Sequence, residues 1–121
     1  VRGMSMSEGV KLHSSIKLVV TASDDRKGPS FGKGAGILLH GIEEYGSLNK
    51  TAKVLHMAYS KAWSMIKKVE EGLGFPLIER YGARGSRLTP EGKRFLELYD
   101  EFEKDVEEYS KQSFERIFKD F

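Results

Sequence analysis

The sequence predicts a mainly α-helical domain with a small β component, extended by one long C-terminal helix. The chain has 121 residues, of which 39% are hydrophobic and 31% charged, and this is enough apolar material for one domain but not for two. Between positions 37 and 73, apolar residues recur at helical spacing in three stretches that are separated by helix-ending signals. After Thr89, by contrast, no helix breaker follows Gly92.

The first part of the chain predicts a flexible terminus and then a strand. Residues 1–10 are polar and are expected to be flexible, and the folded domain is expected to span residues 11–89. The stretch from Leu12 to Thr21 ends in branched apolar residues, which favours a strand. Turn-forming residues follow at 24–29, so a loop is expected there.

Two short helices are predicted next. Apolar residues at helical spacing run from Ile37 to Tyr45, and Gly46 is suited to the left-handed conformation that ends many helices. Ser47 is a suitable N-cap for a second helix, which is expected to run through Leu55.

A third helix is predicted from Tyr59 to Leu73, after a connection of three residues at 56–58. Gly74 is expected to end this helix, and Pro76 would prevent its continuation. The residues expected on its buried face are Ala62, Trp63, Ile66 and Val69.

A hairpin and a long helix complete the predicted order. Leu77 and Ile78 begin a short strand, and residues 87–89 are expected to return beside it around a glycine-containing tip at 81–86. Thr89 as N-cap and Pro90 at the first helical position are a strong start signal for the helix at 90–121. At 1.5 Å per residue this helix would measure about 45 Å, longer than a domain of this size can cover.

The long helix carries an apolar stripe that predicts a dimer seam. Its members are separated alternately by four and three residues, as in two-helix coiled coils. They are Phe95, Tyr99, Phe102, Val106 and Tyr109. A core role within the same chain is the alternative. The three preceding helices can bury one another, however, so the stripe is expected to meet a second copy.

Charge is divided unevenly along the chain. Residues 1–94 contain 16 Lys and Arg against 9 Asp and Glu, whereas residues 95–121 contain 4 against 9. A basic body with an acidic tail indicates that the body meets a polyanion. Ordinary solvated charge is the simpler interpretation of the same numbers.

Two helices joined by three residues and followed by an arginine-bearing hairpin have the plan of a winged helix-turn-helix. In this plan the third helix enters the major groove of DNA, and the hairpin, or wing, reaches the neighbouring backbone. The residues expected to face base edges are Tyr59, Ser60, Lys61 and Ser64. Those expected near phosphates are Lys50, Lys53, Lys67 and Lys68 beside the helix, with Arg80, Arg84 and Arg87 on the wing.

The same residues resemble a known family. The run Tyr59 to Trp63 is the most specific part of a resemblance to the DNA-binding domain of ModE-type molybdate-responsive regulators, which extends over residues 16–105. Other residues that carry it are Gly46, Ser47, Ala52, Leu55, Met57, Leu77, Glu79, Arg80, Leu88, Thr89, Pro90 and Gly92. The region 55–92 is also similar to LysR-type regulators. The resemblance implies a winged helix-turn-helix that binds DNA in a transcriptional regulator.

Two departures limit what the resemblance implies. ModE-type repressors commonly continue into a molybdate-binding domain, and this sequence stops at Phe121, so no such domain and no oxyanion sensing are expected of it. The family usually has serine where Ala58 stands, so the side-chain cap of the third helix, worth about 1 kcal/mol, is expected to be absent.

The sequence therefore predicts a homodimeric, sequence-specific regulator of transcription that binds double-stranded DNA in the cytoplasm, without a cofactor. The chain has no cysteine, and its three histidines are scattered, so no catalytic residue, metal site or enzyme activity is expected. No stretch is long and apolar enough for a membrane span. The alternative is a winged-helix protein-interaction module that binds an acidic partner through the same basic face.

Overall fold

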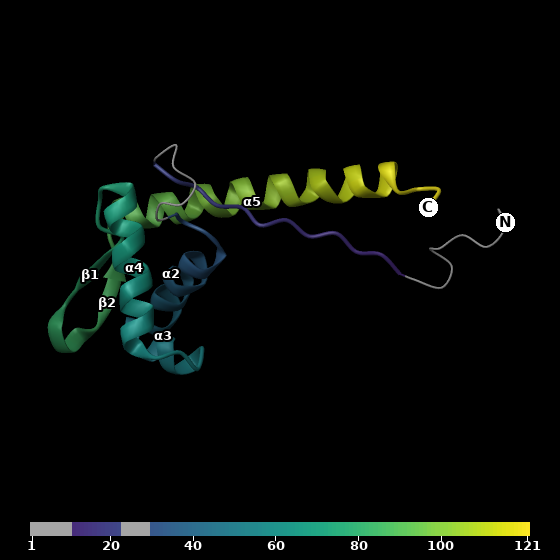
Figure 1. Cartoon of the computed structure of the whole chain (residues 1–121). Helices are drawn as coiled ribbons and strands as arrows, with labels where there is room; N and C mark the ends of the chain where they lie inside the picture. Colours follow the sequence, from purple (N-terminus) through teal and green to yellow (C-terminus); the bar gives the residue numbers. More distant parts are fainter. Residues whose placement is uncertain (1–10, 23–29) are drawn as a thin grey trace.

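The order of elements in the computed structural model is that of a winged helix-turn-helix with a long C-terminal helix (Figure 1). The structure describes residues 11–22 and 30–121, so the predicted flexible terminus at 1–10 and the predicted loop at 24–29 both lie outside the described residues. The elements are α2 (Lys33–Tyr45), α3 (Leu48–Val54), α4 (Tyr59–Leu73), β1 (Ile78–Arg80), the 3-10 helix η1 (Gly82–Arg84), β2 (Ser86–Leu88) and α5 (Pro90–Ile117). The predicted fold class, mainly α with a small β component, is confirmed.

The helix ends follow the local signals of the sequence closely, except at the start of α2. Gly46 and Gly74 both adopt left-handed backbone angles, with φ of 82° and 86°, at the ends of α2 and α4. Helix α2 begins at Lys33, however, four residues before the predicted start at Ile37, and Ile37 is 43% exposed. Its first turn contains Gly34, Ala35 and Gly36, whose small side chains give little periodic apolar signal.

The predicted N-terminal strand is wrong in extent. Within the described residues it is reduced to a single antiparallel bridge, in which Val20 and Phe31 exchange backbone hydrogen bonds of 2.9 and 2.8 Å. A strand needs a neighbour along its whole length, and the residues after Phe31 enter α2 almost at once. The segment therefore runs in an extended form beside α5 without a sheet partner (Figure 1).

The core is centred on Phe31, which is fully buried between α2 and the first half of α5. Its ring centroid lies 4.8 Å from that of Phe95 and 4.9 Å from that of Tyr99. The Tyr99 hydroxyl donates a hydrogen bond of 2.9 Å to the backbone oxygen of Leu18, which ties the extended segment to α5. Burial, aided by the charge of Glu103, raises the pKa of Tyr99 above 10.0. The other large, fully buried side chains are Leu38, Leu39, Ile42, Leu48, Ile66, Leu77 and Thr51.

This core corrects part of the predicted dimer seam. Phe95 packs partly buried against the core and Tyr99 is only 3% exposed, so both residues contact their own chain. The sequence prediction did not include Phe31, which is far away in sequence and supplies the partner for both rings. Further along α5, Phe102 and Tyr109 remain 48% and 66% exposed, and Leu98, which was not predicted, is 46% exposed.

Helix α5 is much longer than the domain that it joins. Its 28 residues correspond to about 42 Å, and its second half extends away from α2, α3 and α4 (Figure 1). Thr89 caps it as predicted, because its Oγ1 accepts a hydrogen bond of 2.9 Å from the Gly92 amide. In the described ranges, no helix combines the length and apolar character that crossing a membrane would require.

Candidate nucleic-acid interface

Helix α4 is presented at the edge of the domain by a tight turn after α3. The N-cap of α3 is Ser47, whose Oγ accepts a hydrogen bond of 3.0 Å from the Lys50 amide. In the turn that follows, His56 has a φ of 54°, an uncommon value for a residue with a side chain. The N-cap of α4 is Ala58, which makes no side-chain cap hydrogen bond, as expected from the sequence.

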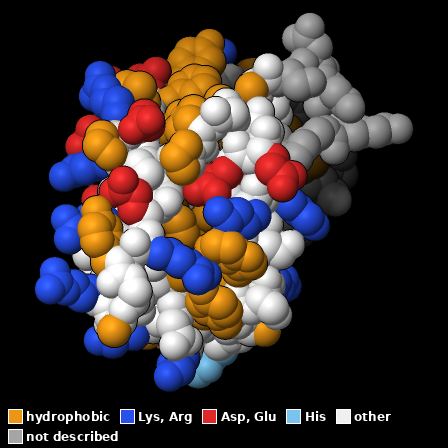
Figure 2. All heavy atoms as spheres, turned by 90° about the vertical axis from the view of Figure 1, so that its left-hand side faces the viewer, with side chains coloured by type: hydrophobic (Ala, Val, Ile, Leu, Met, Phe, Trp, Pro, Cys, Tyr) orange, Lys and Arg blue, Asp and Glu red, His pale blue; other side chains and the backbone are white. Residues whose placement is uncertain are grey.

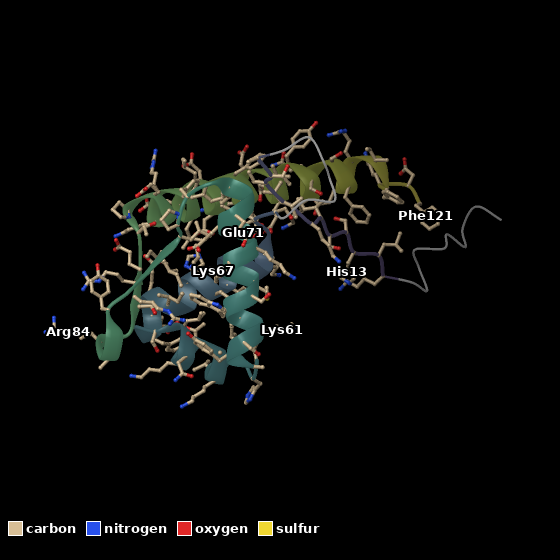
Figure 3. All side chains as sticks on the ribbon, turned by 60° about the vertical axis from the view of Figure 1, so that its left-hand side comes forward. His13, Lys61, Lys67, Glu71, Arg84 and Phe121 are labelled. Atoms are coloured by element: carbon tan, nitrogen blue, oxygen red, sulfur yellow. The ribbon has the colours of Figure 1, made fainter. Side chains whose placement is uncertain are left out.

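The outward face of α4 changes character along its length. Ser60 and Lys61 in the first turn are exposed, Ser64 is half-buried, and Lys68 is exposed one turn later. Glu71 is exposed in the last turn (Figure 3). A carboxylate there would repel phosphates, so the first half of α4 is the part suited to contact nucleic acid.

Glu70 attaches the wing to α4. This carboxylate is nearly buried, and its Oε2 accepts hydrogen bonds from the backbone amides of Leu77, at 2.7 Å, and Ile78, at 3.3 Å. Its Oε1 lies 3.1 Å from the Nζ of Lys67, a residue that the sequence predicts to contact phosphate. Lys67 is thus engaged within the chain.

Next to its tip, the wing is also fixed to the turn between α2 and α3. Strands β1 and β2 pair antiparallel, with Ile78 opposite Leu88 and Arg80 opposite Ser86. The Ser86 amide donates a hydrogen bond of 3.0 Å to the backbone oxygen of Gly46. A Cβ on the neighbouring Gly85 would lie 2.3 Å from that oxygen, so this approach requires glycine.

Two of the three predicted wing arginines lie against aromatic rings. The Cζ of Arg80 is 4.0 Å from the Trp63 ring centroid, and its Nη2 donates a hydrogen bond to the Tyr59 hydroxyl. The Cζ of Arg87 is 4.1 Å from the ring centroid of Tyr81. Arg84, in contrast, is exposed at the tip of the wing (Figure 3).

Positive charge gathers where α3, the start of α4 and the wing tip meet. Residues 46–94 contain ten Lys or Arg against four Glu. Figure 2 shows this side of the molecule, with its Lys and Arg side chains reaching the lower half and its acidic side chains in the upper half. Lys50 and Lys53 of α3 are both exposed. The result is a basic surface next to the exposed first half of α4.

The structure brings most of the predicted site residues to one end of the domain, but in different situations. Those whose side chains are exposed are Lys50, Lys53, Tyr59, Ser60, Lys61, Lys68, Arg80, Arg84 and Arg87. Sequence reasoning missed the contacts that bind Lys67 and Arg80 within the chain. The contact of Lys67 with Glu70 could have been predicted, because opposite charges three residues apart on a helix are neighbours. The contact between Arg80 and Trp63 has no local signal.

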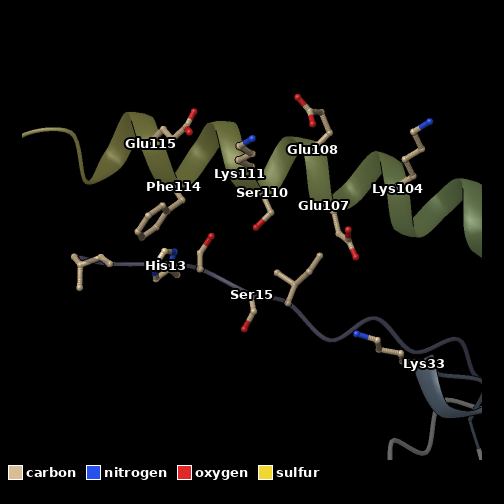
Figure 4. A pocket seen from close by; sticks show the side chains of 13 residues that line it. His13, Ser15, Lys33, Lys104, Glu107, Glu108, Ser110, Lys111, Phe114 and Glu115 are labelled. Carbon is tan, nitrogen blue, oxygen red and sulfur yellow. The ribbon is translucent and has the colours of Figure 1, made fainter. Parts of the chain in front are cut away.

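A hollow lies away from this surface, between the extended segment and the second half of α5 (Figure 4). His13 and Phe114 approach each other across it, and Glu107 and Ser110 point toward the segment (Figure 4). Across residues 11–22 and 30–121, no group of three His, Asp or Glu side chains is arranged to hold a metal ion. Among the described residues, the hollow therefore holds no such metal-binding group.

The fold and its basic surface define a DNA-binding winged helix-turn-helix domain. Residues 38–93 match the family described as "Bacterial regulatory helix-turn-helix protein, lysR family". Over 66 residues the chain is 38% identical to "Molybdenum transport protein ModE" of Azotobacter vinelandii, a match that covers 51% of this chain and 24% of the relative.

Two further relatives agree with this class. "Transcriptional regulator ModE" of Haemophilus influenzae is 34% identical over 74 residues, which cover 58% of this chain and 29% of the relative. "HTH-type transcriptional regulator CzcR" of Bacillus subtilis is 34% identical over 67 residues, which cover 55% of this chain and 23% of the relative. The matched region thus spans about a quarter of the length of these curated relatives. The chain thus contains a winged helix-turn-helix domain that is similar to those of ModE-type and LysR-type regulators.

Proposed function

We propose that this chain regulates transcription as a homodimer that binds a specific sequence of double-stranded DNA. The observation that carries the proposal is the start of α4, where Tyr59, Ser60 and Lys61 are exposed, flanked by exposed lysines of α3 and by the wing. A helix presented in this way fits the major groove, which is about 12 Å wide. The similarity to transcriptional regulators supports the same function.

The contacts divide into base reading and phosphate binding. Lys61 and Ser64, on the exposed side of the first two turns of α4, are assigned to base edges together with Ser60 and Tyr59. Exposed basic side chains around them are assigned to phosphates. These are Lys50, Lys53, Lys68, Arg84 and Arg87.

The partner of α5 is proposed to be a second copy of the chain. Leu98, Phe102 and Tyr109 are exposed on one side of the helix, with Val106 half-buried beside them. Pairing these stripes would remove apolar surface from water, at about 25 cal/mol for each Å². Two domains joined in this way would present two α4 helices to one duplex, and a spacing of about 34 Å would match one turn of DNA.

Selection of duplexes from a random pool by the purified chain tests the function. We expect enrichment of an inverted repeat, because a two-fold dimer reads the same half-site twice. Its affinity should fall with salt, with a log-log slope of about −0.9 for each phosphate contacted. Equal affinity for the enriched duplex and a shuffled duplex of the same composition would contradict the proposal. That result, with weak salt-dependent binding, would favour the protein-interaction alternative.

The division of labour is tested by two matched alanine variants on the selected duplex. Lys61→Ala should relax sequence preference, because Lys61 is assigned to base edges. Arg84→Ala should weaken binding to the selected and shuffled duplexes alike, because a phosphate carries no base identity. The reverse pattern would exchange the roles of α4 and the wing tip.

A further inference from the structure

Arg80 joins the end of β1 to the first two turns of α4. Its guanidinium Cζ lies 4.0 Å from the ring centroid of Trp63 and 6.0 Å from that of Tyr59. Its Nη2 donates a hydrogen bond to the Tyr59 hydroxyl oxygen. A flat, delocalised guanidinium can stack on a ring and donate at its edge at the same time, which a lysine cannot do.

The Trp63 ring is a platform held from several sides. Trp63 is half-buried and packs against the core, and the Nζ of Lys67 lies 4.4 Å from its centroid. Lys67 is in turn paired with Glu70, the carboxylate that holds the first amides of the wing. The stack of Arg80 on Trp63 and its hydrogen bond to Tyr59 therefore add to the connection that Glu70 makes between α4 and the wing.

We propose that Arg80 is a positioning residue, which fixes the wing and the Tyr59 ring relative to α4, and that Tyr59 determines DNA sequence specificity. This inference rests on the function proposed above and extends it to two residues. It also reassigns Arg80, which the sequence alone placed among the phosphate contacts. The contrast is Arg84, for which the described ranges show no side-chain hydrogen bond or ion pair, as is suitable for a phosphate contact.

The hydrogen bond from Arg80 decides what Tyr59 can offer to DNA. A phenol has one O–H donor and two lone pairs on its oxygen. The Arg80 N–H is bonded to one lone pair of the Tyr59 oxygen. Among the described residues no acceptor is seen for the hydroxyl hydrogen, so this hydrogen can be donated to an acceptor on DNA. Tyr59 is the first residue of α4 and is 40% exposed, so it lies where this fold contacts base edges. The acceptors available in the major groove are N7 and O6 of guanine, N7 of adenine and O4 of thymine.

The first test needs no DNA, because Trp63 is the single tryptophan of the chain. Its emission and its quenching by acrylamide are compared in the full chain, in Arg80→Lys and in Arg84→Lys. Arg80→Lys keeps the charge but loses the planar stack, so we expect a red shift and stronger quenching. Arg84→Lys is the matched control and should leave both signals unchanged. Unaltered quenching in Arg80→Lys would overturn the positioning role.

The second test measures the affinity ratio between the duplex selected by the wild-type chain and a shuffled duplex. Tyr59→Phe, which removes only the hydroxyl, and Arg80→Lys should each lower this ratio about three- to tenfold. Affinity for the shuffled duplex and the salt slope should stay unchanged, which also shows that the fold is intact. The double variant should lose no more than either single variant, because both act through one hydroxyl.

Other results of this second test overturn the inference. If Arg80→Lys retains the full ratio, Arg80 acts as a simple charge near phosphate, as the sequence alone predicts. If Tyr59→Phe retains the full ratio, its hydroxyl reads no base. If the wild-type chain has no preferred duplex, the proposed function fails with the role of Tyr59, and the quenching experiment alone still decides whether Arg80 positions the wing.

Discussion

Helix α4 and the part of α5 that follows Tyr99 are both amphipathic, but the chain covers the apolar side of only one of them. In α4, Ala62 and Ile66 are fully buried against α2 and α3. In α5, Phe102 and Tyr109 lie beyond the reach of those helices and remain about half exposed or more. A regular apolar stripe on a helix therefore predicts that the stripe is buried, but it does not predict which segment or chain buries it.

The two regions also differ in charge. The region from 46 to 94 is basic, whereas residues 95–121 contain nine acidic side chains against four basic ones. A polyanion is therefore attracted to α4 and the wing and is repelled by the second half of α5. This separation supports one division of roles, in which α4 contacts DNA and α5 contacts protein.

The largest expected effect on stability comes from a cavity on the buried apolar side of α4. Ile66→Ala should lower the free energy of unfolding by about 2–5 kcal/mol, because it leaves a cavity where no atom is exposed. Phe102→Ala, measured at a concentration where the chain is monomeric, should change it by less than about 0.5 kcal/mol. Urea unfolding checks both variants. Equal losses would mean that the exposed stripe is covered within one chain after all.

The next effect concerns the uncovered stripe. Phe102→Asp combined with Val106→Asp should give a monomer, because two charges would have to be buried in the proposed seam. Its affinity for a duplex with two half-sites should fall about a hundredfold or more through the loss of bivalent binding. Sedimentation and DNA titration measure the two results.

A control for this pair uses the same helix. Lys104→Asp with Lys111→Asp adds acidic side chains at exposed positions outside the apolar stripe. This variant should remain dimeric. A dimer that survives the Phe102 and Val106 substitutions would show that another surface holds the two copies together.

A smaller effect is expected where α4 holds the wing. Glu70→Gln keeps the size of the side chain but removes the charge that strengthens its hydrogen bonds to Leu77 and Ile78. The loss in unfolding free energy should be about 1–2 kcal/mol. Faster hydrogen exchange of those two amides should accompany it. Glu71→Gln, at the exposed neighbouring position, should leave both measurements unchanged.

The smallest effect on stability is expected at Tyr99, near the end of the part of α5 that packs on the core. Tyr99→Phe removes the hydrogen bond to Leu18 and should cost about 1 kcal/mol at neutral pH. The raised pKa means that the folded state holds this proton more tightly than the unfolded state. Its contribution to stability is therefore complete below pH 10 and declines as the pH rises through the folded pKa.

Unfolding measured between pH 8 and pH 11 separates these contributions. The wild type should lose stability above about pH 10 more steeply than Tyr99→Phe. At a concentration where the chain is monomeric, Tyr109→Phe is the matched control, because Tyr109 is then 66% exposed and this variant should follow the wild type. Parallel curves for Tyr99→Phe and the wild type would contradict the role of burial.

Sequence reasoning located the elements well where the signals are local. The left-handed glycines at 46 and 74, and the Thr89 cap followed by Pro90, set helix ends that agree with the structure. Such features depend on residues within a few positions of one another, so a single sequence contains all the information they need.

Partners that are far apart in sequence could not be read in this way. The stripe of α5 has the same spacing throughout, yet Phe31 covers Phe95 and Tyr99 and leaves Phe102 exposed. The position of Phe31 next to α5 therefore helps to separate the two groups. Likewise, the extended segment was predicted as a strand, but strand formation depends on a neighbour, which the described part of the chain provides only opposite Val20.

The order of the helices and of the hairpin, the caps of the helices and the basic character of the region around α4 could all be read from the sequence alone. The tertiary structure decided which charged side chains in that surface are available. Arg80 and Tyr59 are 21 residues apart and meet only because β1 returns to the first turn of α4. Hydrogen bonds and ring contacts act over a few ångströms, so their partners are set by the packing of distant segments and not by spacing along the chain.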